Sequence, residues 1–324
     1  MLRGAKELLQ RSAGGVLDAT AGPLNWRLGD GIRRMLALPW KLRAHPPVGS
    51  VAPGPNTACA GLPRVAAVLD EFSRICLEPA CELVLPRPGD FVSVLGDAPP
   101  DLLLVESAWN GNHGAWRSRV ESSLRGFDRD LARLVDWCHR HGIPTVFWNK
   151  DDPVHFGRFA YSASLFGRVY TTDADCLPAY RRRLRHHRVD ALPFAAQPAV
   201  HHPMRDGPRT ARACFAGSAW SARYSRRRRD LDVLLRPALD RGLDIYDRNW
   251  NIGGIKALKW RYPERYRSAI RGGLSYRDMV RTYRAYRVFL NVNSVTQSPT
   301  MFSRRGFELL ACGSVADRNV LKVL

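Results

Sequence analysis

The sequence predicts an α/β protein with two doubly wound parallel sheets, and three observations lead to this fold class. From residue 64 onward, short strand-like apolar runs alternate with longer segments of helical periodicity, which is typical of parallel strands joined by crossover helices. A segment containing Pro198, Pro203 and Pro208 interrupts the alternation, which then restarts. The length of 324 residues is enough for two domains of ordinary size.

The first predicted domain covers residues 61–197. We expect its strands at residues 64–69, 101–106, 144–149, 168–172 and 189–194. Apolar residues recur at helical spacing over residues 116–141, where Gly142 ends the pattern, and again over residues 175–186.

A linker at residues 198–210 precedes the second predicted domain, residues 211–324. Its strands are expected at 212–217, 243–247 and 288–293, and its helices at 226–241, 276–286 and 300–312. Only eleven residues follow Gly313. We therefore expect either a small second sheet or a domain that is truncated at its C-terminus.

Residues 1–60 form a basic leader that Pro and Gly interrupt repeatedly. Within it, residues 26–43 combine apolar positions at helical spacing with several cations, a pattern that suits a helix on an anionic membrane surface. The pattern suits a partner-docking helix or an unstructured leader equally well. No apolar run reaches membrane-spanning length and no signal peptide is recognisable, so we expect a cytoplasmic protein, with peripheral contact at the inner face of the membrane left open.

The charge of the chain is strongly basic and unevenly distributed. Fifty basic and 30 acidic residues give a net charge of +20. Residues 49–208 carry 18 of each sign, whereas residues 209–324 carry 24 basic and 9 acidic side chains. Arginine makes up nearly all of the basic residues, which is also what coding bias would produce. The last third of the chain nevertheless favours an anionic ligand.

The seven scattered cysteines lack paired spacing, so we expect neither a zinc site nor disulfides.

The segment 291–313 carries the most informative pattern for ligand binding. A strand end rich in Asn and Ser leads through Pro299 into a helix, whose first N–H groups can bind an anion. Thr300 is the expected N-cap. Arg304 and Glu308 are four residues apart, so they form either a surface ion pair or a phosphate and a ribose contact. The predicted ligand-binding residues are Gly217, Ser218, Asn293, Ser298, Thr300, Arg304, Arg305 and Glu308.

Acidic and imidazole groups follow the predicted strands of the first domain. Glu106, Asp151, Asp152 and His155 are the candidates for a general base or catalytic carboxylate, because they lie at carboxyl ends of strands. His113, on the glycine-rich loop 110–114, is a weaker candidate.

Several separated motifs of the chain carry a family resemblance. These are the segment 291–313 and the motifs LDIYD at 243–247, FAGS at 215–218, WNKDDP at 148–153, TTDAD at 171–175 and VESAW at 105–109. Together they resemble the CgeB-type glycosyltransferases. The resemblance spans about residues 64–313 and implies a GT-B architecture, in which two Rossmann-like domains bind the acceptor and the nucleotide-sugar donor respectively.

The resemblance also implies roles for individual residues. Glu308 falls where related enzymes place a donor-ribose contact, and Gly217 and Ser218 fall at the turn that approaches the diphosphate. The related enzymes have another glutamate at a position that is Met301 in this sequence, so the residue that would contact the donor sugar is unassigned. No cofactor is implied beyond the donor as substrate, and the GT-B likeness argues against a required metal at Asp151 and Asp152.

The sequence therefore predicts transfer of a sugar from a nucleotide-diphosphate donor to an acceptor hydroxyl. Two alternatives stay open: a catalytically inactive, truncated remnant, or a basic nucleic-acid-binding protein. The charge would suit nucleic acid, but no recognition motif for it is visible. The basic run 223–229 is either a solvated helix face or an anion contact.

Overall fold

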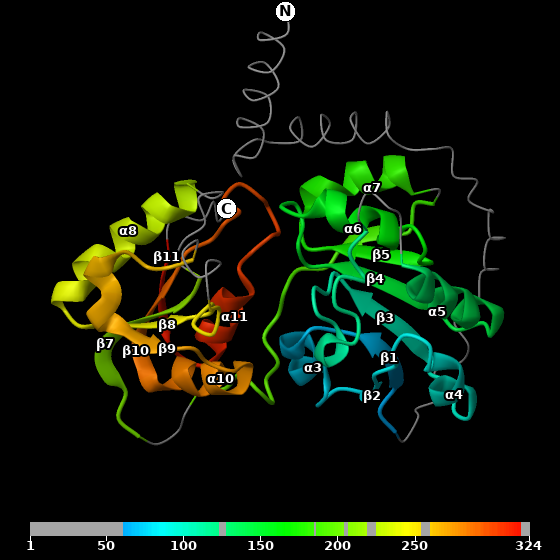
Figure 1. Ribbon diagram of the computed structural model, residues 1–324, viewed down its shortest axis with the longest axis horizontal. Coiled ribbons are helices and arrows are strands. Elements are labelled where there is room, and N and C mark those ends of the chain that lie inside the picture. The colour runs from blue at the N-terminus through cyan, green and yellow to red at the C-terminus, as the bar shows by residue number, and fades with distance from the viewer. Residues whose placement is uncertain are drawn as a thin grey trace, which may run out of the picture. The chain divides into compact units, whose positions relative to one another are not determined.

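The computed structural model describes residues 61–122, 128–184, 186–203, 207–218, 225–253 and 260–318. Within them the chain divides into an N-terminal unit that ends at Pro193 and a C-terminal unit that begins at Phe194. The predicted leader, including residues 26–43, lies outside the described residues. Both units are parallel α/β sheets with helical crossovers, as the sequence predicts (Figure 1).

The N-terminal unit contains a six-stranded sheet in the order β2-β1-β3-β4-β5-β6, and every neighbouring pair is parallel. Its strands are β1 (Arg64–Val68), β2 (Glu82–Val84), β3 (Leu102–Glu106), β4 (Thr145–Asn149), β5 (Arg168–Thr171) and β6 (Val189–Ala191). Its helices are α3 (Glu71–Leu77), α4 (Phe91–Gly96), α5 (Arg129–Arg140), α6 (Phe156–Ala163) and α7 (Leu177–Arg183), with 3₁₀ turns η1 (Asn112–Gly114) and η2 (Ala174–Cys176).

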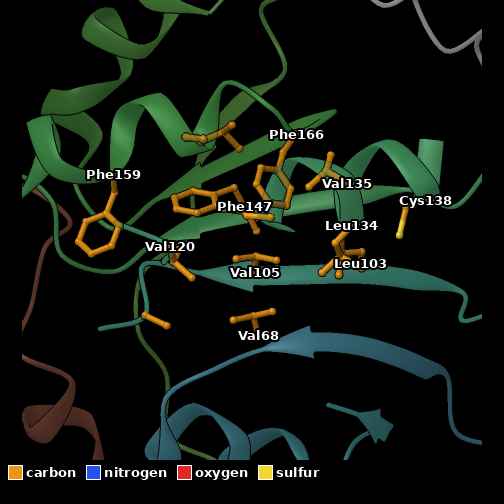
Figure 2. Close-up of a cluster of buried hydrophobic side chains, with 14 of the residues drawn as sticks. Val68, Leu103, Val105, Val120, Leu134, Val135, Cys138, Phe147, Phe159 and Phe166 are labelled. Atoms are coloured by element: carbon orange, nitrogen blue, oxygen red, sulfur yellow. The ribbon is translucent and has the colours of Figure 1, made fainter. Parts of the chain in front are cut away.

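Apolar side chains cover both faces of this sheet, which is why its strands are almost continuously hydrophobic. On one face, Val68 of β1, Leu103 and Val105 of β3 and Phe147 of β4 pack with the apolar side of α5 (Figure 2). On the other face, alternate residues of β1 pack with Leu102 and Leu104. This packing on both faces of the sheet fixes the positions of the strands and of the residues at their carboxyl ends.

The C-terminal unit contains a five-stranded parallel sheet in the order β11-β10-β7-β8-β9. Its strands are β7 (Thr210–Gly217), β8 (Leu243–Asp247), β9 (Ile270–Gly272), β10 (Tyr286–Asn291) and β11 (Val315–Arg318). Its helices are α8 (Ser225–Asp240), α10 (Tyr276–Ala285) and α11 (Arg304–Ala311), with a 3₁₀ segment η3 (Glu264–Ala269). Leucines of α8 pack on one face of the sheet, and side chains of α10 and α11 pack on the other.

The strand order of each sheet reverses at one place. In the N-terminal unit the reversal lies between β1 and β3, and in the C-terminal unit it lies between β7 and β10. The connections that follow two such strands run to opposite faces of the sheet. A crevice therefore opens between these connections at the carboxyl ends of the strands, which is where ligands of open α/β sheets bind. Ligand-binding residues are therefore expected at these two strand reversals.

Three predicted helix boundaries are wrong. The helix expected over residues 116–141 begins only at Arg129, because Asp128 accepts hydrogen bonds from the amides of Asp130 and Leu131 as an N-cap. Before it, Trp116 lies buried in a series of turns. The helix expected over residues 175–186 is the short turn η2 followed by α7.

The helix expected over residues 300–312 begins at Arg304, so Thr300 is not its N-cap. Ser303 takes that position, with no capping hydrogen bond from its side chain. The Ser298 hydroxyl instead accepts from the amides of Thr300 at 3.3 Å and Met301 at 2.8 Å, which forms a separate turn before the helix.

The predicted linker also differs from the structure. Gln197 to His201 form a turn, and the Arg209 guanidinium donates to the Cys312 carbonyl at 2.8 Å. These residues belong to the C-terminal unit, which begins before the predicted linker does. Beyond Gly313, β11 adds a strand that the sequence pattern did not predict.

Candidate active site

Gly217 ends β7 at the strand reversal of the C-terminal unit. Its carbonyl accepts a 2.7 Å hydrogen bond from the Tyr262 hydroxyl. A Cβ atom on Gly217 would lie 3.3 Å from Phe215 Cζ and 3.8 Å from Arg305 Nη1. The structure thus brings two of the predicted binding residues, Gly217 and Arg305, side by side. Ser218, also predicted, follows directly and is partly exposed.

Two asparagines at the carboxyl end of β10 connect this strand to the start of α11. The Asn291 amide nitrogen lies 3.4 Å from the Asn293 side-chain oxygen, and the Ser303 hydroxyl lies 3.4 Å from the Asn291 oxygen. Both asparagine side chains are buried. Asn293 is therefore held at the strand reversal, whereas Ser298 serves the turn that follows it.

Arg305 projects from the first turn of α11 and is half-buried. Its Nε donates to the Tyr283 hydroxyl at 3.4 Å, and its guanidinium lies 5.9 Å from the Phe289 ring centroid. Among the residues that the structure describes, no carboxylate forms a salt bridge with Arg305. A cation in this position is suited to an external anion.

Glu308 lies inside the C-terminal unit, with a side chain that is 0% exposed. Its Oε1 accepts from the Tyr276 hydroxyl at 2.5 Å and from Arg304 Nη1 at 2.7 Å, and its Oε2 accepts from the Tyr283 hydroxyl at 2.9 Å. Burial raises the pKa of Glu308, but Arg304 and the two hydroxyl donors outweigh burial, so the pKa is lowered overall. The Arg304–Glu308 ion pair is confirmed, although it is not on the surface, and the predicted ribose contact stays a prediction.

His201 completes the surroundings of Glu308, with Nε2 3.5 Å from Oε1. Its Nδ1 accepts from the Gln197 amide at 3.1 Å, so its Nε2 carries the proton and lies 3.0 Å from the Tyr276 hydroxyl. Burial lowers the pKa of His201; the Glu308 carboxylate acts to raise it, but burial and the neighbouring arginines outweigh Glu308, so the pKa is lowered overall. His201 is therefore a neutral donor, which sequence reasoning missed because it lies far from Glu308 along the chain.

Glu106 ends β3 at the strand reversal of the N-terminal unit and is fully buried. Its Oε1 lies 2.8 Å from Lys150 Nζ, and its Oε2 accepts from the Ser73 hydroxyl at 2.5 Å. Burial raises its pKa despite the attraction of Lys150. Glu106 is thus enclosed by its own chain rather than open to a substrate, and its predicted catalytic role stays untested.

Asp70 lies two residues after β1, at the start of α3, and was not among the predicted site residues although it follows a predicted strand. Its carboxylate accepts from the amides of Asn110 at 3.1 Å and Gly111 at 3.0 Å and from Lys150 Nζ at 3.0 Å. Burial acts to raise its pKa, but Lys150 and the amide donors lower it overall. Asp70 therefore fixes the glycine-rich loop at the strand reversal.

Asp152 is also enclosed. Its Oδ1 accepts from the Asn149 amide at 2.8 Å, and its Oδ2 lies 2.6 Å from the Thr171 hydroxyl and 3.0 Å from the Tyr180 hydroxyl. Burial raises the pKa of Asp152 to about 8, so the carboxyl is neutral at pH 7. Its predicted catalytic role also stays a prediction.

Asp151 and His155 differ from Glu106 and Asp152 in being half-exposed. Asp151 Oδ2 accepts from the Ser107 hydroxyl at 2.9 Å, and Oδ1 lies 3.3 Å from the Trp109 indole nitrogen. The Trp109 ring also meets the His155 ring edge-on, with centroids 5.1 Å apart. The structure thus gathers two of the predicted catalytic residues around one indole, at the ends of β3 and β4.

Comparison with known proteins adds a class of reaction to this geometry. Residues 211–316 match a family model described as glycosyl transferase-like, which supports sugar transfer in general. None of the curated proteins compared with the chain matches it. One similar crystal structure is provisionally assigned as a UDP-N-acetylglucosamine 2-epimerase from Listeria monocytogenes, with 7% identity, a TM-score of 0.41, and 71% of this chain and 74% of that chain covered. In the described part of the chain, we find no helix with the length and apolarity needed to cross a membrane.

Proposed function

We propose that the protein is a glycosyltransferase of the CgeB type, which moves a sugar from a nucleoside-diphosphate donor to an acceptor hydroxyl. One observation carries the proposal: Arg305, with no carboxylate partner among the described residues, lies beside Gly217 at the strand reversal of the unit that matches the family model. The nucleoside diphosphate is the leaving group of the proposed reaction, and negative charge develops on it as its bond to the anomeric carbon breaks. A cation beside the diphosphate stabilises this charge.

The proposed donor site consists of backbone and side-chain groups around this reversal. Gly217 lets a phosphate approach the backbone closely, since it has no Cβ. Arg305 faces the same place from α11 and would stabilise the anionic leaving group. The other predicted donor residues assigned to this site are Ser218, Asn293, Ser298, Thr300 and Arg304.

The proposed acceptor chemistry uses the N-terminal unit. A base must take the proton of the acceptor hydroxyl as its oxygen attacks the anomeric carbon, if the reaction inverts the configuration there. Asp151 and His155 are the half-exposed candidates, whereas Glu106 and Asp152 are enclosed. We assign the base to Asp151 or His155, and the enclosed carboxyls to support of the site.

Titration calorimetry of the full chain against UDP, GDP and dTDP tests the proposal. One nucleoside diphosphate should bind saturably, and Arg305→Ala should weaken it by about tenfold or more, as expected for one charge-assisted hydrogen-bonding group. Arg281→Ala is the matched control, because Arg281 is exposed and pairs with Asp278 on α10. A short RNA duplex at near-physiological salt serves as the comparator. Binding of RNA without any nucleotide would support the nucleic-acid alternative and refute the proposal.

A further inference from the structure

Glu308 is fully buried and accepts hydrogen bonds from three donors of its own chain. One of them is the Arg304 guanidinium, which lies 2.7 Å from Oε1 and stacks 4.9 Å from the Tyr276 ring centroid. The carboxylate and the ring thus fix the arginine from two sides. The Arg304 side chain remains 23% exposed, whereas that of Glu308 is 0% exposed.

A second connection runs from Glu308 to Arg305. The Tyr283 hydroxyl donates to Glu308 Oε2 at 2.9 Å and accepts from Arg305 Nε at 3.4 Å. Because Tyr283 is buried and its pKa is raised by burial, its hydroxyl keeps its proton and can serve both contacts at once. The orientation of Arg305 beside Gly217 thus depends on a carboxylate that Arg305 does not touch.

We propose that Glu308 is a positioning residue for anion binding: it orients Arg304 directly and Arg305 through Tyr283, so that both guanidinium groups face a diphosphate. The inference rests on the proposed function and gives Glu308 a role different from a ribose contact. Because the Glu308 carboxylate is fully buried, a ribose hydroxyl could reach it only if one of the tyrosine or arginine donors around it moved aside. Such a displacement leaves a buried polar group unpaired, which is unfavourable.

The two roles predict different ligand dependence, which inorganic pyrophosphate can reveal. Pyrophosphate has the anionic groups of a nucleoside diphosphate but no ribose. If Glu308 orients the arginines, Glu308→Gln weakens pyrophosphate and the nucleoside diphosphate by the same factor, about tenfold. If Glu308 contacts ribose, the substitution weakens only the nucleoside diphosphate, and the inference is wrong.

Tyr283→Phe provides a second variant that keeps the aromatic ring and all charges. Removing the hydroxyl should weaken pyrophosphate about threefold in the wild-type background and have no effect in the Arg305→Ala background, because the hydroxyl acts through that guanidinium. A purely structural role of Tyr283 would give the same loss in both backgrounds, and would overturn the link to Arg305.

Controls separate failure of this inference from failure of the proposed function. Near-ultraviolet circular dichroism checks that each variant is folded. If Glu308→Gln does not fold, the effect of Tyr283→Phe on pyrophosphate binding tests the inference instead. Wild-type protein that binds neither pyrophosphate nor any nucleoside diphosphate contradicts the proposed function and, with it, the inference. Wild-type binding that Glu308→Gln and Tyr283→Phe leave unchanged contradicts the inference alone.

Discussion

Lys150 and Glu106 form an ion pair inside the N-terminal unit, with 2.8 Å between Nζ and Oε1 and side chains that are 6% and 0% exposed. The same ammonium lies 3.0 Å from Asp70 Oδ2, so a single cation serves two carboxylates. Asp70 in turn accepts hydrogen bonds from the glycine-rich loop. The loop at the strand reversal therefore depends on a lysine from β4's carboxyl end.

Replacing Lys150 by Met should destabilise the protein strongly. The substitution removes the cation that Glu106 and Asp70 share and leaves their carboxylates without it. Removing one partner of a buried ion pair costs about 3–5 kcal/mol. Urea unfolding at pH 7 measures the loss. Adding Glu106→Gln to Lys150→Met should restore part of the stability, because it removes one of the two uncompensated charges. A single-variant loss below about 1 kcal/mol would mean that the pair is solvated like a surface pair.

The sequence predicted the central strands well because they are buried on both faces and read as apolar runs. β2 and β9 were missed because three residues, 82–84 and 270–272, are too few to show a pattern. The helix starts at Arg129 and Arg304 were missed because a cap and a turn, rather than apolar spacing, decide them.

The candidate site was predictable only where residues are close in the sequence or directly follow a strand. The spacing of Arg304 and Glu308 gave an ion pair as one of two alternatives, and placed it on the surface. Its burial comes from Tyr276 and Tyr283 of α10, which the spacing does not reveal. The pairing of Lys150 with Glu106 requires β3 and β4 to be neighbours, and a single sequence does not state the strand order.

Asn112 should be essential for the conformation of the glycine-rich loop. Its side-chain oxygen accepts from the Leu69 amide at 3.1 Å, and its nitrogen donates to the carbonyls of Ala67 at 2.8 Å and Pro86 at 2.9 Å. Its φ of 46° is in the left-handed region, which Asn tolerates better than Ala.

Asn112→Ala should therefore reduce the free energy of unfolding by about 2–4 kcal/mol, since three buried hydrogen bonds to the backbone are lost. Asn110→Ala is the matched control, because Asn110 is exposed and its side-chain oxygen accepts a hydrogen bond from Arg117 Nε at 3.2 Å on the surface. Equal losses in the two variants, measured by urea unfolding, would show that the buried contacts of Asn112 are not what stabilises the loop.

Asp151 and His155 should be separable by turnover once a donor is identified. Substitution of a general base lowers kcat by about 10²- to 10⁴-fold. Asp151→Asn and His155→Gln keep the size of each side chain, so we expect one of them to lose activity on this scale while donor affinity is retained. Initial rates with saturating donor measure kcat, and calorimetry measures donor binding. If neither variant loses more than a few-fold in kcat, the base lies elsewhere.

Asp152 should make the stability of the protein fall as the pH rises from about 4 to about 8. Burial raises its pKa in the folded state to about 8 from an ordinary value of 3.8, so between these values the folded protein keeps a proton that the unfolded chain has lost. The free energy of unfolding then decreases with pH across this window, by up to about 1.4 kcal/mol per pH unit from this group.

The carboxylic proton has an acceptor in the folded protein. The Thr171 hydroxyl lies 3.2 Å from the Asp173 carbonyl, to which it can donate, and it can accept the Asp152 proton across 2.6 Å. Asp152→Asn imitates the neutral acid, so its stability should depend less on pH than that of the wild type, and it should be the more stable protein at pH 8. Asp190→Asn, at an exposed carboxylate that pairs with Arg168, is the control and should keep the wild-type slope. Urea unfolding from pH 5 to pH 8 measures all three proteins, and parallel slopes for Asp152→Asn and wild type would mean that Asp152 is ionised in the folded state at neutral pH.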